Sequence, residues 1–232
     1  MLTDIFSSFD SYEFNSIYLN TLIIFTPFLT MIFISSNLWL MSTRTNSSLK
    51  ILINIIFNQL MRTNSNNLKG FTMMVSAMFI LLILMNLSGM TPYVFSPSSH
   101  LMLTLNLGLP LWMSLMMSSF ITNKKEFMAC LLPDGAPMWL NPFLVIIETI
   151  SIFVRPLTLS FRLAANMSAG HIVMSLLGIY GSSYMFTNSP MMLTMFLIIP
   201  GYIMFELTIC LIQAYIFCLL ISLYSNDHTT SH

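Results

Sequence analysis

The chain has 232 residues, of which 56% are hydrophobic and only 7% are charged, and its eight basic and eight acidic side chains cancel. An average soluble domain has about 25% charged residues, so the composition excludes a water-soluble globular protein. Without a net charge, long-range attraction cannot recruit nucleic acid. We therefore expect a lipid bilayer as the surroundings, no nucleic-acid partner, and a function that depends on individually placed charges.

The three cysteines, Cys130, Cys210 and Cys218, have no metal-ligand spacing. An odd number of cysteines in or beside apolar segments argues against a disulfide framework. We expect them to be small core residues, and we expect neither a metal site nor a cofactor.

Long uncharged segments dominate the chain, and about 20 apolar residues are enough for a helix to cross the hydrocarbon core. Residues 17–40, 70–88 and 100–122 contain no Asp, Glu, Lys or Arg, and the two longer stretches 135–181 and 190–225 are apolar with few charges. Turn-forming residues at 88–99 separate the second and third segments, and those at 181–190 predict a loop between the last two. The sequence thus predicts an all-α polytopic membrane protein with about five membrane-embedded helices.

Residues 46–62, between the first two segments, have an amphipathic pattern. Polar side chains recur there at steps of three and four residues, namely Ser47, Lys50, Asn54, Asn58 and Arg62, while isoleucine and leucine fill most of the other positions. We predict an amphipathic helix that lies at the membrane interface, with an ordinary loop as the alternative.

Basic residues outside the C-terminal stretches gather in the first and third connections. They are Arg44, Lys50, Arg62, Lys69, Lys124 and Lys125. The positive-inside rule assigns these connections to the cytoplasm-like face of the membrane. The acidic N-terminus, with Asp4, Asp10 and Glu13, is then expected on the opposite face.

A helix from 142 to 180 would be well over 50 Å long at about 1.5 Å per residue, against about 30 Å of hydrocarbon. It must tilt or bend, and Pro156, Pro200 and Gly201 are places where the two long helices can bend. We predict a long, inclined helical hairpin over 139–225. The chain then divides into three parts. Residues 1–69 contain the acidic N-terminus, the first span and the interfacial helix; residues 70–138 contain two spans with their loops; and residues 139–232 contain the hairpin.

The first helix of this hairpin contains Glu148, Arg155 and Arg162. A charge at the bilayer centre costs roughly 2.5–3.5 kcal/mol on an insertion scale, and such residues usually face a water-filled cavity or a partner and mark ion pathways. The three are seven residues apart, which returns each to nearly the same helix face. Arg162 has no oppositely charged side chain within one or two turns, so it requires a partner elsewhere.

The second hairpin helix has its own polar seam. Glu206 and Gln213 are seven residues apart, and Asp227 follows fourteen residues later. Arginine cannot release its proton at any relevant pH, so it acts as a fixed charge that repels protons and attracts carboxylates. Glutamate and histidine can bind and release protons, which makes Glu148, Glu206 and His171 candidate relay groups.

Structural roles compete with these assignments. Glu148 and Arg155 could form an intrahelical ion pair that eases insertion. His171 could bond a backbone carbonyl between helices. Asn166 and Gln213 could form interhelical hydrogen bonds rather than line a pore.

Three segments carry a recognisable family pattern: NLSGMTPYVFSPSSHLMLTLNLGLPLW at 86–112, IIETISIFVRPLTLSFRLAANMSAGH at 146–171, and FELTICLIQAYIFCLLISLYSND at 205–227. They resemble subunit a of F-type ATP synthases in its animal mitochondrial form. FRLAANMSAGH, followed about forty residues later by IQAY, is highly specific, whereas the first 70 residues agree mainly in layout.

This resemblance implies a multi-pass protein of the mitochondrial inner membrane whose N-terminus is in the intermembrane space. It implies a proton-translocating stator subunit of the Fo sector, beside a rotor ring of c-type hairpin subunits that each bear a mid-membrane carboxylate. Peripheral-stalk and other small Fo subunits are the other implied partners. The hairpin then forms the proton path.

The resemblance also implies residue roles. It assigns the essential arginine, which separates two offset half-channels, to Arg162, and an auxiliary arginine to Arg155. The half-channel from the intermembrane space is assigned to Glu206, His171, Asn166 and Gln213. The matrix half-channel is assigned to Glu148 and Asp227.

Two other function classes are a secondary transporter and a structural subunit of another membrane complex. Residues 17–122 and 139–225 show no evident internal repeat and few polar residues, which argues against a transporter, and a buried arginine argues against a purely structural subunit. The chain has no GxxxxGK[ST] segment, so we expect it neither to bind nor to hydrolyse ATP and not to be an enzyme on its own.

Overall fold

The computed structural model describes residues 44–63, 70–91, 96–131, 139–187 and 189–226, together with Phe9 and Leu68. The predicted first span at 17–40, the acidic residues of the N-terminus and Asp227 lie outside these ranges. All regular structure in the described ranges is helical, which confirms the all-α fold class.

The helices follow one another in this order: α2 (Arg44–Leu60), α3 (Phe71–Gly89), the short 3-10 helix η4 (Pro97–Ser99), α4 (Leu101–Thr122), α5 (Lys124–Cys130), α6 (Asn141–Thr187) and α7 (Ser189–Asn226). Four of the described helices, α3, α4, α6 and α7, are long and apolar enough to cross a membrane. The spans predicted at 70–88 and 100–122 are confirmed by α3 and α4. Gly70, the residue before α3, has a φ of 80°, a left-handed conformation that glycine adopts easily.

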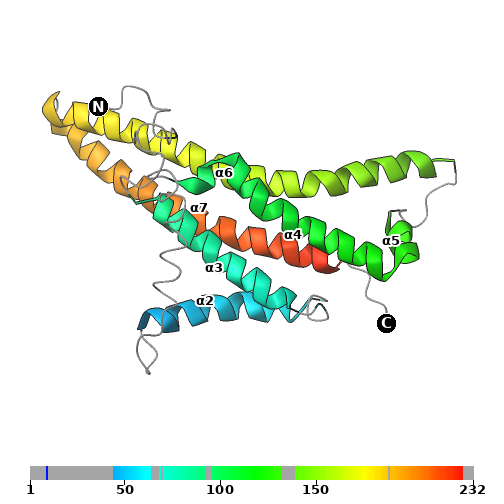
Figure 1. The fold of residues 1–232 in the computed structure, drawn as a ribbon. Coiled ribbons are helices and arrows are strands. Elements are labelled where there is room, and N and C mark those ends of the chain that lie inside the picture. Colours follow the sequence, from blue (N-terminus) through cyan, green and yellow to red (C-terminus); the bar gives the residue numbers. More distant parts are fainter. Residues whose placement is uncertain are drawn as a thin grey trace, which may run out of the picture.

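The long hairpin is formed by α6, with 47 residues, and α7, with 38. At about 1.5 Å per residue α6 is about 70 Å long, so only a strongly inclined helix fits about 30 Å of hydrocarbon. Pro156 and Pro200 lie inside these helices. Figure 1 shows α6 and α7 side by side, both curved along their length, as expected for an inclined hairpin.

The predicted loop at 181–190 is wrong in its length: α6 continues to Thr187 and α7 begins at Ser189, so the two helices part within this segment but most of it is helical. The reason lies in the serines, which were interpreted as turn formers. Ser182 Oγ and Ser183 Oγ each donate a hydrogen bond of 2.8 Å to a carbonyl three residues earlier, on Ile179 and Tyr180. A serine whose hydroxyl is satisfied by its own helix does not have to end it.

Helix α2 confirms a helix rather than a loop in the connection after residue 40. Ile56 and Leu60 are buried, while Ile51 and Ile55 are exposed. The helix contacts α3, and the Gln59 side-chain amide donates a hydrogen bond to the Tyr215 hydroxyl on α7. Its location at the membrane interface remains a prediction.

The core lies where α3, α4, α6 and α7 meet. Its buried side chains include Val75, Phe79, Leu82, Leu111, Leu159, Leu163, Ala214 and Phe217. Because lipid tails are as apolar as leucine, close van der Waals packing rather than water exclusion stabilises such an interface. The core fixes which face of α6 turns inward, and Leu163 on that face orients its neighbour Arg162 outward.

Candidate functional site

A cavity of about 170 Å³ lies between α3, α6 and α7. The polar side chains that line it are Asn86 from α3, Asn166 from α6, and Tyr202, Glu206 and Gln213 from α7. On α7 these residues are four and seven apart, so the helical period brings them to one face. Three helices therefore contribute polar side chains to one partly open cavity with an otherwise apolar wall.

Asn166 and Gln213 join α6 to α7 across this cavity. Asn166 Nδ2 donates a hydrogen bond of 2.9 Å to Gln213 Oε1, and Gln213 is only 4% exposed. The structure brings these two residues into direct contact. Their bond is the interhelical contact considered as an alternative, and both residues also line the cavity.

Glu206 is the buried carboxyl group of the cavity, with 4% of the residue exposed. A Cβ atom at Gly170 on α6 would lie 1.3 Å from Glu206 Oε1, so the carboxyl group occupies the space that any larger residue would need. Tyr202, one turn earlier on α7, lines the same cavity as Glu206. The absence of a side chain at Gly170 therefore leaves the space that the Glu206 carboxyl group occupies.

Three buried polar atoms in this cavity have no hydrogen-bond partner among the described protein atoms: Glu206 Oε2, Gln213 Nε2 and Asn86 Oδ1. A buried polar group without a partner is costly, and ordered water usually supplies one where the site is polar and large enough. Asn86, Gly170 and Tyr202 were not among the predicted site residues. Asn86 had a usable signal, since it is an amide that follows the mostly apolar run 71–85 in a predicted span.

Arg162 lies on α6 one turn before Asn166, and its side chain is exposed. One turn is about 6 Å of rise along the helix, so Asn166 links the cavity to the surroundings of Arg162. The described residues offer this guanidinium no salt bridge. The sequence-based expectation that Arg162 needs a partner outside its own helix is consistent with this placement.

The surface beside Arg162 is made of small residues. Thr158, Ala165 and Ala169 lie at steps of three or four residues from Arg162 or from each other, and all three are exposed. The strip that these three residues form is flanked by the larger exposed side chains of Val154 and Phe161. Small residues on a membrane helix allow another helix to approach closely.

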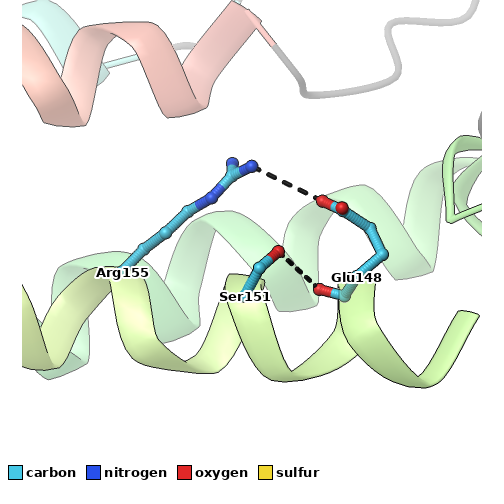
Figure 2. A network of polar contacts seen from close by, with 3 residues as sticks. All are labelled: Glu148, Ser151 and Arg155. Carbon is cyan, nitrogen blue, oxygen red and sulfur yellow. Dashed lines mark hydrogen bonds and ion pairs between the residues drawn. The ribbon is translucent and has the colours of Figure 1, made fainter. Parts of the chain in front are cut away.

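Glu148 and Arg155 form an ion pair near the start of α6, with 3.6 Å between Glu148 Oε1 and an Arg155 terminal nitrogen. Figure 2 shows the two side chains reaching toward each other, with Ser151 between them donating a hydrogen bond of 2.8 Å to the Glu148 carbonyl. The Arg155 guanidinium also lies over the Tyr224 ring on α7, 5.5 Å from its centroid. The intrahelical ion pair considered in the sequence analysis is thus present, and neither residue lines the cavity.

His171 is half-buried and follows Gly170, but it does not line the cavity as the described residues form it. Its ring packs edge to face against Phe9, with 6.2 Å between ring centroids, and His171 Nε2 has no partner among the described atoms. His171 is therefore not part of the cavity lining that Asn166 and Gln213 share. Asp227 lies outside the described residues.

Comparison with known proteins points to one family. The family model described as ATP synthase A chain matches residues 16–226. The ATP synthase subunit a of Albinaria caerulea is 39% identical over 231 residues, which cover 98% of this chain and 100% of that protein. The subunit a proteins of Locusta migratoria and Drosophila yakuba are 39% and 38% identical over 233 and 232 residues, in each case 98% of this chain and 99% of the relative.

Proposed function

The chain belongs to the family of F-type ATP synthase subunit a, the proton-channel stator subunit of the Fo membrane sector, and we propose how its residues carry protons. Two offset half-channels lead to and from the carboxylates of a rotor ring, and an arginine between them blocks direct passage. One observation carries the proposal: the buried Glu206 lines a cavity, and the exposed Arg162 lies on α6 one turn before Asn166, another residue of the cavity lining.

The cavity is the inner end of the half-channel from the intermembrane space. Glu206 is the proton-binding group, and Asn166 and Gln213 fix the geometry around it through their 2.9 Å hydrogen bond. A carboxyl group can take up and release a proton, whereas amides only orient water and neighbouring groups. His171 lies further along the same path, on the turn of α6 that leads away from Arg162.

Arg162 is the boundary between the two half-channels. Its guanidinium stays charged, so it cannot pass a proton on, and it attracts a carboxylate from a partner. The strip of Thr158, Ala165 and Ala169 lets a rotor helix come close enough for this contact. The membrane potential supplies about 2.3 kcal/mol per charge per 100 mV, which drives rotation only when protons cannot bypass the ring.

The matrix half-channel begins near the start of α6. Glu148 supplies the proton-accepting group there, and Arg155 is an auxiliary positive charge held by Glu148 and Tyr224. Asp227 belongs to the same exit. Peripheral-stalk and other small Fo subunits are the further partners, and the chain has no nucleotide site of its own.

The proposed location is the mitochondrial inner membrane, with the N-terminus in the intermembrane space. An epitope tag inserted in 63–68 should be reachable only from the matrix, and one in 1–12 only from the intermembrane space. Both tags on one side would mean that residues 17–40 do not span the membrane.

Single cysteines test the two half-channels by the side from which Ag⁺ reaches them. In a background without Cys130, Cys210 and Cys218, a cysteine at 206 should react from the intermembrane-space side and one at 148 from the matrix side. Equal labelling of both from the same side would contradict the two-path proposal. A cysteine at 227 is less decisive, because it lies close to the end of the chain.

A ring-dependence experiment separates the proposal from its alternatives. Vesicles that contain the Fo complex should conduct protons passively, and vesicles with the same chain but no ring subunits should not. Conduction without the ring would favour a secondary transporter, and no conduction in either preparation would favour a structural subunit.

A further inference from the structure

We propose that Asn86 on α3 is a positioning residue of the proton path, where it holds, together with Gln213, a water molecule that exchanges protons with Glu206. The inference rests on the proposed function of the cavity and extends it, because it brings a third helix into a path otherwise built from α6 and α7.

The orientation of the Asn86 side chain is fixed by a bond across helices. Asn86 is 1% exposed, and its Nδ2 donates to the Cys210 carbonyl on α7 at 3.4 Å. Cys210 lies four residues after Glu206 and three before Gln213, so this bond places the amide between the two along α7. The remaining acceptor, Asn86 Oδ1, belongs to a residue of the cavity wall and has no protein partner among the described atoms.

The unpartnered atoms match the bonding capacity of one water molecule. Gln213 Nε2 is a donor, while Asn86 Oδ1 and an ionised Glu206 Oε2 are acceptors. Water can accept from the first and donate to the other two. The cavity of about 170 Å³ is large enough for a water molecule, which needs about 10–15 Å³ of such space. The three atoms are themselves buried, so their side chains must turn slightly toward the cavity to bond this water.

This water passes a proton on by exchanging one O–H bond for another. The water gives one proton to Glu206 Oε2, so that one O–H bond breaks as another forms, and it takes one proton from the next water outward. Release runs in reverse. Asn86 exchanges no proton and acts only by holding the water in line.

Few titratable groups line the cavity together with Asn86. Those that line the cavity are Glu206, Tyr202 and Cys210, all on α7. The cavity residues on α3 and α6 carry amide, methyl, thioether or no side-chain groups. A change at Asn86 that adds a titratable group should therefore be visible in the pH dependence.

The first test replaces Asn86 with leucine, which is similar in volume but has no polar atom, in the complete complex. Proton-driven ATP synthesis per assembled complex should fall about tenfold, less than the roughly hundredfold that misplacement at a reacting centre can cost. Ser76→Ala is the matched control, because the buried Ser76 hydroxyl on the same helix bonds only the Met73 carbonyl, at 2.9 Å. It should leave the rate unchanged.

A second variant, Asn86→Asp, keeps the shape and the acceptor and adds a carboxyl group near Glu206. It should keep at least half of the rate and shift the pH of half-maximal proton flux by about one unit, because like charges disfavour each other's ionisation. The shift requires the new carboxyl group to lie close to Glu206, so it tests the placement of residue 86 beside the proton path. Should Asn86→Leu not assemble, the Asp variant decides alone.

A wild-type rate in Asn86→Leu, or an unshifted pH profile in Asn86→Asp, would overturn the inference. Glu206→Gln, measured in parallel, separates this failure from failure of the proposed function. Activity lost in Glu206→Gln but not in the Asn86 variants rejects only the role of Asn86. Activity kept in Glu206→Gln rejects the proton path through the cavity.

Discussion

Arg155 and Arg162 lie two turns apart on the same helix and have different surroundings. Arg155 pairs with Glu148 at 3.6 Å and lies over the Tyr224 ring, so the chain supplies its counter-charge and an aromatic contact. Arg162 is exposed beside small residues, without a salt bridge to any described residue. Moving a charge into a membrane is costly in both cases.

The difference indicates what each charge is for. A charge neutralised within its own chain can be inserted and then contributes to packing. An arginine left without a counter-charge, next to a surface that permits close approach, is suited to a counter-charge on another subunit.

The largest effect is expected at Arg162. Arg162→Ala should abolish proton-driven ATP synthesis, a loss of about a hundredfold or more, as for a removed charge at a preorganised site. Arg162→Lys should also fail largely, because a desolvated lysine can lose its proton. Arg155→Gln should retain substantial synthesis. ATP synthesis per assembled complex in the three variants measures the contrast, and near-equal rates in Arg155→Gln and Arg162→Ala would contradict it.

A large effect is also expected at Gly170. In Gly170→Ala the new Cβ would lie 1.3 Å from Glu206 Oε1, so the carboxyl group must move away. We expect synthesis to fall by about tenfold to a hundredfold, the range for misplacement near a reacting group.

The matched control for Gly170→Ala is Gly178→Ala on the same helix, where a Cβ would meet nothing within 4 Å. It should leave synthesis unchanged and stabilise α6 by about 0.5–1 kcal/mol. Equal losses in both variants would mean that the effect reflects the helix and not the position of Glu206.

Much of the architecture follows from the sequence, because a membrane permits few structures. The hydrocarbon core requires backbone groups to be paired internally, so apolar runs of sufficient length predict helices such as α3 and α4. The turn at 181–190 was mispredicted because serine hydroxyls can bond within a helix. Composition alone does not distinguish these two uses of serine.

The site was predictable where it depends on spacing along one helix. The seven-residue repeat placed Glu148 near Arg155, and the structure confirms their pairing. The contacts of Asn86, Gly170 and Tyr224 depend on which helices become neighbours. Spacing within a helix carries no information on the partner across the interface, so the partners of these residues could be found only in three dimensions.

A small effect is expected at Tyr224. Tyr224→Leu removes the ring under Arg155, a contact worth about 0.5–1 kcal/mol at a partly exposed site, and should lower synthesis by no more than about threefold. Tyr224→Phe keeps the ring and should match the wild type. A severe loss in Tyr224→Leu would show that Arg155 also takes part in proton transfer, and the two arginines would no longer differ in kind.

The central claim is that Arg162 prevents protons from passing between the two half-channels without the ring. The most direct measurement is passive proton flux through Fo in which the ring has been cross-linked to the stator so that it cannot rotate. The account predicts no flux in the wild type or in Arg155→Gln, and a clear leak in Arg162→Ala. A locked Arg162→Ala complex as tight to protons as the wild type would contradict the claim.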